Sequence, residues 1–258
     1  MSFPDRWDDG TDPSTPAHQV HWYDDRTAII RQSLHTNFEG PFLYLLLGEQ
    51  RALLVDTGTG HTPLRPLVTS LLADRMPAGY EFVVVHTHGH GDHVGGDSEF
   101  DHVVGRSAEE VAEYFGFADW PNGVVQLDLG GRVLDVLAIP GHHASHIALY
   151  DRNTRLLLTG DSLYPGRLYV FDWPAFRTSI ARLGEFVAAG NPVEWVLGAH
   201  IELTNRPGED YEMGADKHPD EHVLQLRPAV LTELADVLRD AGEQPVRIDR
   251  DDFIVYPV

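Results

Sequence analysis

The sequence predicts an α/β protein of the α+β kind, with layered sheets and helices on their outer sides. Three observations predict this fold class. Strand-like segments occur in groups of two or more before each helix-like segment of the 258-residue chain. Several short apolar runs end directly at a histidine or an aspartate. The hydrophobic fraction is 42%, which is ordinary for a globular protein with a core.

The first half of the chain begins with residues rich in Asp, Pro, Ser and Thr. We expect a loose tail at 1–17 and a single domain over 18–258. Partly alternating apolar segments predict strands at 19–23, 27–34, 42–47 and 51–55. Leucines at helical spacing predict a helix over 62–73 that starts at Thr62 and Pro63. A buried strand over 82–85 follows, and then a helix over 107–114 that Ser107 caps.

The second half repeats this order of strands before helices. Its predicted strands lie at 124–129, 132–139, 145–150 and 155–159. Pro174 near the start and Gly190 at the end delimit a predicted helix over 173–189. The remaining predicted elements are a buried strand at 195–197, a polar loop at 201–219, a helix at 227–241 and edge strands within 246–258.

Composition excludes several classes of function. The formal net charge of −21 disfavours binding to nucleic acid and to anionic membranes. No stretch approaches the roughly 20 apolar residues that cross a bilayer, and the acidic N-terminus lacks the pattern of a signal peptide, so we expect a cytoplasmic protein. The chain has no cysteine, so any metal must be held by the side chains of His, Asp or Glu.

Four residues of metal-ligand type follow the predicted strand at 82–85, namely His88, His90, Asp92 and His93. Glycines separate the first three, and residues two apart in an extended chain point the same way. Clustered imidazoles would repel one another if protonated, whereas neutral imidazole and carboxylate are natural ligands of zinc and similar ions. The segment therefore predicts a metal site.

Three further ligand-type residues lie downstream in similar positions. His142, Asp161 and His200 each follow an apolar run and a nearby glycine. Rigid strands that end at one rim would deliver these side chains to a common, preorganised site.

Five motifs in this order resemble the metallo-β-lactamase superfamily. They are Asp56 in Val-Asp-Thr-Gly, the His-x-His-x-Asp-His box at 88–93, His142 in Pro-Gly-His, Asp161 in Thr-Gly-Asp and His200 in Gly-Ala-His. The resemblance implies a four-layer αβ/βα sandwich with two metal ions at one rim. It assigns His88, His90 and His142 to the first metal, and Asp92, His93 and His200 to the second. It also implies that Asp161 bridges both metals, while Asp56 orients a ligand without binding metal.

The resemblance implies a metal-dependent hydrolase that acts on a small ester, lactone or thioester. Two divalent ions, with zinc favoured over iron or manganese, would lower the pKa of a shared water from about 15.7 towards neutrality. The resulting metal-bound hydroxide would attack the substrate, and Asp92 would assist proton transfer. Tyr164 lies where the related lactonases place a donor to the substrate carbonyl, so the resemblance suggests an oxyanion role for it.

Two other activities of the same superfamily stay open. One is a mononuclear iron-dependent oxidoreductase similar to persulfide dioxygenases, and the other is a phosphodiesterase. His93 and His200, beside a complete first set of ligands, favour two metals over one. Arg167, Tyr169 and His143 would either contact the substrate or cover the rim. We expect a small-molecule substrate, and a homodimer is an open alternative to a monomer.

Glutathione thioester hydrolases of this superfamily usually bind the peptide carboxylates with basic residues near the C-terminus. Here Arg206, Lys217 and Arg227 are scattered among acidic residues. This distribution weakens the assignment of glutathione thioesters as substrates.

Overall fold

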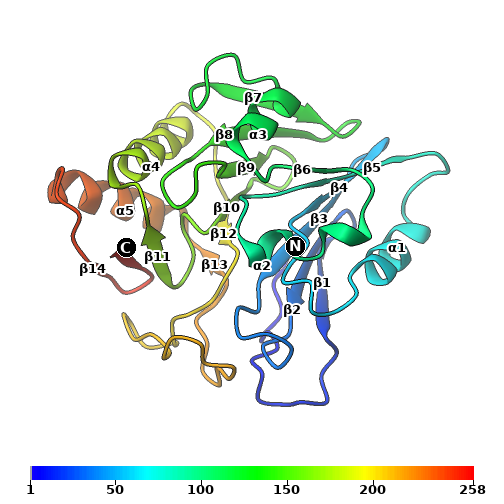
Figure 1. The fold of residues 1–258 in the computed structure, drawn as a ribbon, viewed down its shortest axis with the longest axis horizontal. Helices are drawn as coiled ribbons and strands as arrows, with labels where there is room; N and C mark the ends of the chain where they lie inside the picture. The colour runs from blue at the N-terminus through cyan, green and yellow to red at the C-terminus, as the bar shows by residue number, and fades with distance from the viewer. Residues whose placement is uncertain (1) are drawn as a thin grey trace.

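Two six-stranded sheets face each other in the computed structural model, which describes residues 2–258 (Figure 1). The first sheet runs in chain order through β1 (His18–Asp24), β2 (Thr27–Gln32), β3 (Phe42–Leu47), β4 (Arg51–Val55), β5 (Glu81–Val85) and β6 (Val103–Val104). Neighbours from β1 to β4 are antiparallel, whereas β4, β5 and β6 are parallel. Connected antiparallel strands followed by parallel ones match the predicted grouping of strands before helices.

The second sheet has the order β13 (Gln225–Leu226), β12 (Trp195–Gly198), β10 (Leu156–Gly160), β9 (Ile147–Asp151), β8 (Val133–Ala138) and β7 (Val124–Asp128). The neighbouring strands β10 and β12 are parallel, so their carboxyl ends lie at the same edge. A small third sheet contains β11 (Arg167–Val170), β15 (Ile254–Pro257) and β14 (Ile248–Asp249). Sequence analysis missed β6, β11 and β13, which are only two to four residues long.

Helices cover the outer face of each sheet, as Figure 1 shows. The helices within residues 2–258 are α1 (Arg65–Ala73), α2 (Gly91–Val94), α3 (Ala108–Phe115), α4 (Trp173–Ala188) and α5 (Pro228–Ala241), with a 3₁₀ turn at Asp97–Glu99. The outer layers are formed by α1, α4 and α5, whereas Val111 of α3 packs in the core between the sheets. Apolar residues of α1 pack against the first sheet, and those of α4 and α5 pack against the second. The order helix, sheet, sheet, helix confirms the predicted four-layer sandwich.

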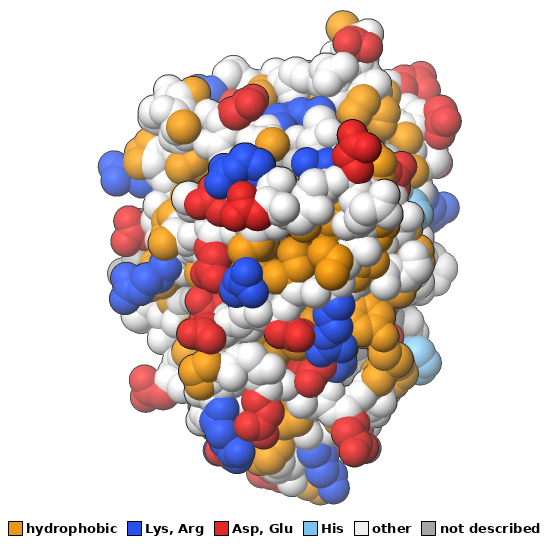
Figure 2. Space-filling view, turned by 90° about the vertical axis from the view of Figure 1, so that its left-hand side faces the viewer, with side chains coloured by type: hydrophobic (Ala, Val, Ile, Leu, Met, Phe, Trp, Pro, Cys, Tyr) orange, Lys and Arg blue, Asp and Glu red, His pale blue; other side chains and the backbone are white. Residues whose placement is uncertain are grey.

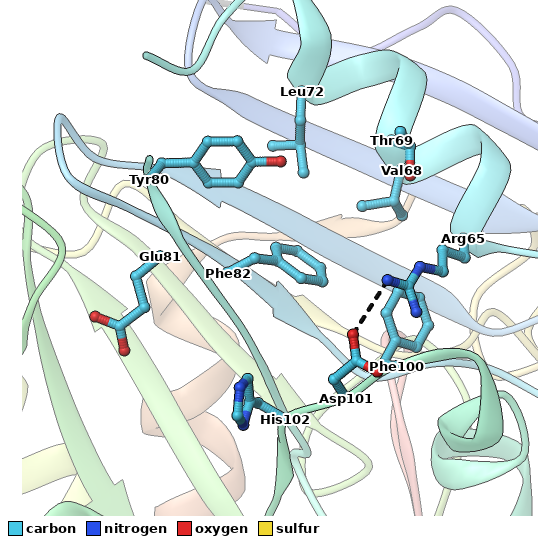
Figure 3. Close-up of a pocket in the computed structure, with 10 residues that line it drawn as sticks. All are labelled: Arg65, Val68, Thr69, Leu72, Tyr80, Glu81, Phe82, Phe100, Asp101 and His102. Atoms are coloured by element: carbon cyan, nitrogen blue, oxygen red, sulfur yellow. Dashed lines mark hydrogen bonds and ion pairs between the residues drawn. The ribbon is translucent and has the colours of Figure 1, made fainter. Parts of the chain in front are cut away.

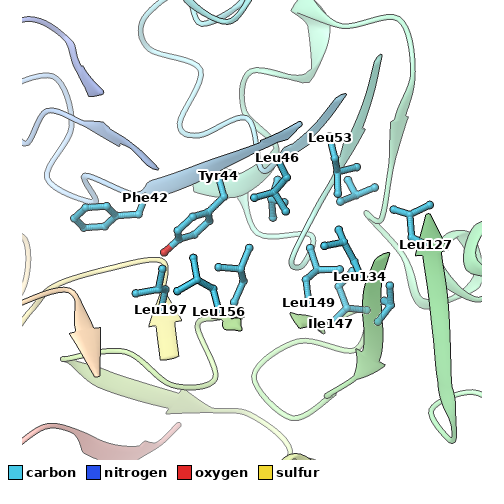
Figure 4. Packing of buried hydrophobic residues seen from close by; sticks show 14 of the residues in the cluster. Phe42, Tyr44, Leu46, Leu53, Leu127, Leu134, Ile147, Leu149, Leu156 and Leu197 are labelled. Carbon is cyan, nitrogen blue, oxygen red and sulfur yellow. The ribbon is translucent and has the colours of Figure 1, made fainter. Parts of the chain in front are cut away.

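The main core lies between the two sheets. Figure 4 shows Phe42, Leu46 and Leu53 of the first sheet opposite Leu134 and Leu149 of the second. The hydroxyl of Tyr44 crosses this layer and donates a hydrogen bond to the carbonyl of Gly198 at 2.5 Å. Because each strand buries alternate side chains here, the sheets hold a fixed distance and register. That rigidity places the strand ends relative to one another.

Helix α1 begins later than the sequence predicted. The expected start at Thr62 and Pro63 is wrong, because the first helical residue is Arg65. The carboxylate of Glu99 accepts hydrogen bonds from the backbone N–H groups of Leu64 and Arg65, each at 3.0 Å. A residue distant in sequence therefore supplies the cap that the local sequence lacks. By contrast, Ser107 caps α3 as predicted, accepting from the backbone N–H of Glu110.

The segment predicted as a loose tail is held against the first sheet along part of its length. Residues 2–17 form no helix or strand, and Met1 lies outside the described residues. The ring of Trp7 is buried and packs edge-on against Phe42, with 5.0 Å between the ring centroids. The ring of Phe3 packs against that of Tyr23 in a tilted arrangement, with 5.1 Å between the centroids. These aromatic side chains outweigh the polar composition that suggested a tail.

Figure 2 shows the face that α4 and α5 form, with hydrophobic side chains near its centre and charges of both signs around them. Acidic and basic groups are interspersed here in spite of the large negative net charge. Within residues 2–258, no helix combines the length and apolar character needed to traverse a bilayer. A homodimer stays a prediction.

Candidate metal centre

The candidate ligands lie where strands of both sheets end. His88 and His90 follow β5, and His142 follows the second-sheet strand β8. Asp161 directly follows β10, and His200 lies two residues after β12. The parallel pairing of β10 with β12 brings their two donors to the same edge. The structure thus brings all seven predicted ligands together, in two groups.

The box at 88–93 changes conformation in its middle. Asp92 lies in the short helix α2, which His90 precedes as the N-cap residue with extended dihedral angles. The expectation that Asp92 points the same way as His88 and His90 is therefore wrong. Asp92 joins the second group instead, because the turn of α2 redirects the chain.

The first group consists of His88, His90 and His142. The Nδ1 atom of His90 lies 3.0 Å from Nε2 of His88 and 2.9 Å from Nε2 of His142. Burial lowers the pKa of His88 well below its usual value, and it also lowers the pKa values of His90 and His142. Three neutral ring nitrogens that converge in this way form a natural site for one divalent cation.

The second group consists of Asp92, His93, Asp161 and His200. Oδ2 of Asp92 lies 3.2 Å from Nε2 of His93 and 3.2 Å from Nε2 of His200. Burial alone would raise the pKa of Asp92, but the neighbouring His93 and His200 outweigh it and lower that pKa far below its usual value. This carboxylate is therefore ionised and available as a ligand or a proton acceptor.

Asp161 lies between the two groups. Its Oδ1 atom is 3.4 Å from Nε2 of His93 and 3.4 Å from Nε2 of His200. Its Oδ2 atom faces the first group, 3.5 Å from Nε2 of His142 and 3.8 Å from Nε2 of His88. One oxygen directed at each group is the arrangement that a carboxylate bridging two metal ions requires.

Backbone carbonyls hold two of the imidazoles in a defined tautomer. Nδ1 of His142 donates to the carbonyl of Tyr169 at 2.7 Å, and Nδ1 of His200 donates to that of Glu39 at 2.9 Å. Each ring therefore carries a hydrogen on Nδ1 and directs Nε2 at the centre, which is the orientation that a metal ligand needs. Sequence analysis missed Glu39, because a backbone acceptor leaves no signal in the residue type.

Asp56 holds His93 in the same way, with Oδ2 accepting from Nδ1 at 2.9 Å. The backbone N–H of Thr87 donates to Oδ1 at 2.7 Å, and the Thr87 hydroxyl donates to Oδ2 at 2.8 Å. Burial raises the pKa of Asp56, but His93 and His86 outweigh this effect and lower it to about 2. Asp56 also has a φ of 66°, a left-handed conformation that is rare for residues other than glycine. This strain persists because the surrounding hydrogen bonds determine the position.

The donor set fits bound cations. Nε2 of His93 and Oδ1 of Asp161 are buried and make no hydrogen bond within residues 2–258. Buried polar atoms without partners are costly, and both atoms point into the second group. Imidazole nitrogens and carboxylate oxygens, with no thiolate, suit zinc and also admit iron or manganese.

Close packing around the box explains one of its two glycines. A Cβ atom on Gly89 would lie 2.4 Å from the carbonyl oxygen of Arg106, which no side chain tolerates. A Cβ on Gly91 would meet nothing within 4 Å, so the backbone does not require glycine there. At the end of β10, Gly160 has a φ of 50°, and a Cβ would lie 2.6 Å from Nε2 of His146.

Tyr164 is buried beside this centre, with its ring centroid 5.6 Å from that of His200. Its hydroxyl donates to the carbonyl of Arg167 and lies 3.2 Å from Oε2 of Glu202. An oxyanion role for Tyr164 stays a prediction, and it requires the hydroxyl to leave the Arg167 carbonyl.

Arg167 is paired inside the protein. Its guanidinium donates to Asp210 at 2.7 Å, to the carbonyl of Tyr211 at 2.8 Å, to Tyr169 at 3.0 Å and to Glu202 at 3.3 Å. Only 6% of the residue is exposed. The role in substrate binding that the sequence left open for Arg167 would require these bonds to break.

Aromatic and histidine side chains border the first group. Phe171 is 60% exposed, and its ring packs edge-on against His90 and His142 at 5.9 and 5.7 Å. The ring of His143 lies 4.8 Å from that of His90. Phe171 therefore presents an apolar surface next to the centre, whereas Trp173 and Phe176 belong to the core.

A cavity of about 290 Å³ adjoins the second group. Its lining includes the ligand His200 together with Phe38, Glu39, Arg167, Tyr169, Glu202, Glu212 and Met213. A separate cavity of about 400 Å³ lies between α1 and β5, where Figure 3 shows Leu72, Phe82 and Phe100 beside the Arg65–Asp101 ion pair. The residues that line this separate cavity include none of the seven candidate ligands.

Comparison with known families and proteins supports the same interpretation. The sequence model of the metallo-beta-lactamase superfamily matches residues 37–200, which include all seven candidate ligands and Asp56. A metallo-beta-lactamase from Pontibacter korlensis has a similar structure, with a TM-score of 0.60 and 19% identity. The match covers 86% of this chain and 99% of that protein. At this identity the likeness demonstrates the fold alone.

Two kinds of relative are similar in sequence over most of their length. The acyl-coenzyme A thioesterase MBLAC2 of Gallus gallus is 30% identical over an alignment of 203 positions, which covers 62% of this chain and 72% of the relative. The hydroxyacylglutathione hydrolase of Aeromonas hydrophila is 27% identical over an alignment of 206 positions, which covers 76% of this chain and 74% of the relative. Both names denote hydrolases.

Proposed function

The chain belongs to the metallo-beta-lactamase superfamily and is a hydrolase of that fold, and from this premise we propose that it cleaves a small thioester or ester. We further propose that two divalent metal ions serve the reaction, with zinc as the favoured metal. Lactones are the alternative, because they contain the same kind of acyl bond. The names of the two relatives favour thioesters, since one hydrolyses acyl-coenzyme A and the other hydroxyacylglutathione.

The arrangement of Asp161 is the observation that carries the proposal. One of its oxygens faces His93 and His200 at 3.4 Å each, and the other faces His142 at 3.5 Å and His88 at 3.8 Å. A mononuclear centre needs only one of these groups, whereas here both are complete. Two ions are therefore favoured over one.

The first group and the second group would each hold one ion. Bound metal ions would polarise the substrate carbonyl and make a water molecule more acidic. The protein prepares the site by orienting its ligands. Carbonyls of Tyr169 and Glu39 and the carboxylate of Asp56 fix the Nδ1–H tautomers of His142, His200 and His93. Because these acceptors belong to the folded backbone or the core, the donors need no rearrangement when substrate binds.

Asp92 is the candidate for proton transfer. Its carboxylate is ionised, and 20% of the side chain is exposed at the edge of the second group. In the proposed reaction the water oxygen bonds to the acyl carbon, the bond from that carbon to sulfur or oxygen breaks, and the leaving group departs with the electron pair. Asp92 accepts a proton from the water and passes it to the leaving group, which yields a carboxylic acid and a thiol or alcohol.

Tyr164 remains a candidate donor to the developing oxyanion. Its position next to His200 supports this role, although its hydroxyl is bonded to the Arg167 carbonyl without substrate. The variant Tyr164→Phe tests it. A fall in kcat without loss of metal would support the role, and an unchanged kcat would remove it.

The proposed function is tested by metal analysis and hydrolysis on the same protein sample. We expect two zinc ions per chain after loading, and release of thiol from a small thioester such as S-butyryl-N-acetylcysteamine. Parallel assays with an acyl-homoserine lactone and a phosphodiester distinguish the alternatives. One iron ion per chain with no hydrolysis would contradict the proposal.

A matched pair of variants links the activity to the centre. Asp161→Asn should remove one metal ion and nearly all turnover, since an amide bridges two cations poorly. Asp240→Asn makes the same change at an aspartate that is 78% exposed on the surface, and it should retain both metals and full activity. Equal activity of the two variants would contradict the role of the bridge.

A further inference from the structure

The cavity beside the second group shares the ligand His200 with the metal centre. Its volume is about 290 Å³. Glu39 lines it and also accepts the hydrogen bond of His200 through its backbone carbonyl. The cavity therefore has space for one end of a substrate whose acyl carbon lies at the centre.

Acidic side chains dominate the described lining of the cavity. The lining contains three carboxylates, those of Glu39, Glu202 and Glu212, one guanidinium, that of Arg167, and the imidazoles of His200 and His218. Arg167 and Glu202 form an ion pair with each other at 3.3 Å. His218 pairs with Glu221, 3.1 Å away. The carboxylates of Glu39 and Glu212 form no ion pair within residues 2–258. Burial raises the pKa of Glu39, whereas the neighbouring His200 lowers it.

The guanidinium of Arg167 is not available to a substrate anion. Asp210, Glu202, Tyr169 and the carbonyl of Tyr211 accept the hydrogen bonds that this guanidinium donates within residues 2–258. The residue is almost fully buried, so a carboxylate or phosphate of a ligand would have to displace protein acceptors. An anionic group in the cavity would thus face two unpaired carboxylates, and the lining within residues 2–258 has no arginine or lysine free to bind it.

Apolar side chains complete the cavity. Phe38 and Met213 line it and are 47% and 67% exposed. An aromatic ring beside carboxylates favours an alkylated ammonium group over a phosphate or a carboxylate. The carboxylates and the apolar side chains of the lining therefore both favour a cationic or neutral group over an anionic one.

We propose that Glu39 and Glu212 determine specificity by excluding anionic leaving groups, so that the enzyme prefers substrates whose group in this cavity is cationic or neutral. This inference rests on the proposed thioester or ester hydrolysis. It separates the substrate of this chain from acyl-coenzyme A and hydroxyacylglutathione, the substrates that the names of the relatives state. The physical cause is repulsion by unpaired carboxylates, strengthened where the cavity wall excludes water.

Three thioesters with one acyl group test the proposal on the zinc-loaded protein. They are butyrylthiocholine with a cationic leaving group, S-butyryl-N-acetylcysteamine with a neutral one, and S-butyrylglutathione with an anionic one. All three release a thiol, so one assay gives every kcat/KM. We expect the order cationic, neutral, anionic, with about tenfold between the extremes and a smaller ratio at high salt.

Charge-removing variants assign the effect to the two residues. Glu39→Gln and Glu212→Gln should each reduce the ratio of cationic to anionic kcat/KM about threefold. Glu243→Gln is the matched control, because Glu243 is exposed beyond α5 and lines a different cavity. A preference for the glutathione thioester, or a ratio that neither variant alters, would overturn the proposal.

A binding experiment separates failure of this inference from failure of the proposed function. S-butyl thioethers of the same three thiols cannot be hydrolysed, and calorimetric titration gives their affinities. If no thioester is cleaved but the thioethers bind in the order cationic, neutral, anionic, the proposed function fails and the charge selection holds. If the thioesters are cleaved without this order, the function holds and the selection is refuted.

Discussion

Replacing Asp56 by asparagine tests whether this buried carboxylate sets the tautomer of His93. Oδ1 accepts from the backbone N–H of Thr87 at 2.7 Å, so the amide oxygen must stay on that side. The amide NH₂ then takes the place of Oδ2 and faces Nδ1 of His93, which is 2.9 Å away. Because NH₂ is a donor, His93 has to accept at Nδ1 and carry its proton on Nε2. That proton occupies the atom that the second metal needs.

The expected loss follows from this change of tautomer. Removing a partner that orients a metal-bound histidine weakens metal affinity by about 10- to 100-fold, which corresponds to about 1.4 to 2.8 kcal/mol. We expect the second ion to be lost to a chelator at a correspondingly lower concentration, while the first ion is retained. Chelator competition with metal analysis measures both sites. Nitrogen-15 NMR of the imidazoles reports the tautomer of His93 directly.

The same substitution at the exposed Asp101 provides the control, because this carboxylate pairs only with Arg65 at the surface. Asp101→Asn should bind both ions as the wild type does. If Asp56→Asn also kept wild-type affinity for two ions, or if His93 kept its proton on Nδ1, the reasoning from tautomer to metal affinity would be refuted.

Three further predictions concern stability. Leu149→Ala removes a side chain that lies between the sheets and is 1% exposed. It should lower the free energy of unfolding, measured by urea titration, by about 2 to 5 kcal/mol without changing the slope against urea concentration. A loss below about 1 kcal/mol would contradict the packing. Arg167→Met leaves Glu202 and Asp210 without their cation and should cost about 2 to 3 kcal/mol by the same titration, whereas no loss would mean that the ion pairs are not formed in solution. Removal of metal by a chelator should lower the melting temperature, and added zinc should restore it. The reason is that free zinc at about 1,000 times its Kd raises the free energy of unfolding by about 4 kcal/mol. An unchanged melting temperature would argue against tight metal binding.

Much of the fold and of the candidate site could be predicted from local patterns. Each candidate ligand lies in a segment that follows a strand, and the apolar run or glycine before it is visible in the sequence. The helix at α3 has its own serine cap, so its start was predictable within one residue. These features depend on neighbouring residues alone, which is why composition and periodicity reveal them.

Local patterns could not predict contacts between residues that are far apart along the chain. Arg31 is buried and binds Glu221, 190 positions away, and the sequence around either residue does not indicate the other as its partner. The cap of α1 by Glu99 is of the same kind, as is the burial of Trp7 on Phe42. Each contact exists because sheet pairing brings together segments whose local sequences are unrelated.

The sequence by itself determined the types of ligand and the strand ends that carry them, because residue chemistry and burial periodicity are local properties. Only the tertiary structure decided that Arg167 is neutralised by Glu202 and Asp210, and that Glu39 and Glu212 line a cavity beside His200. The physical reason is that electrostatics and metal geometry depend on distances of a few Å between side chains. Those distances arise when two sheets pack and their strand ends meet, and no single segment of the chain encodes them.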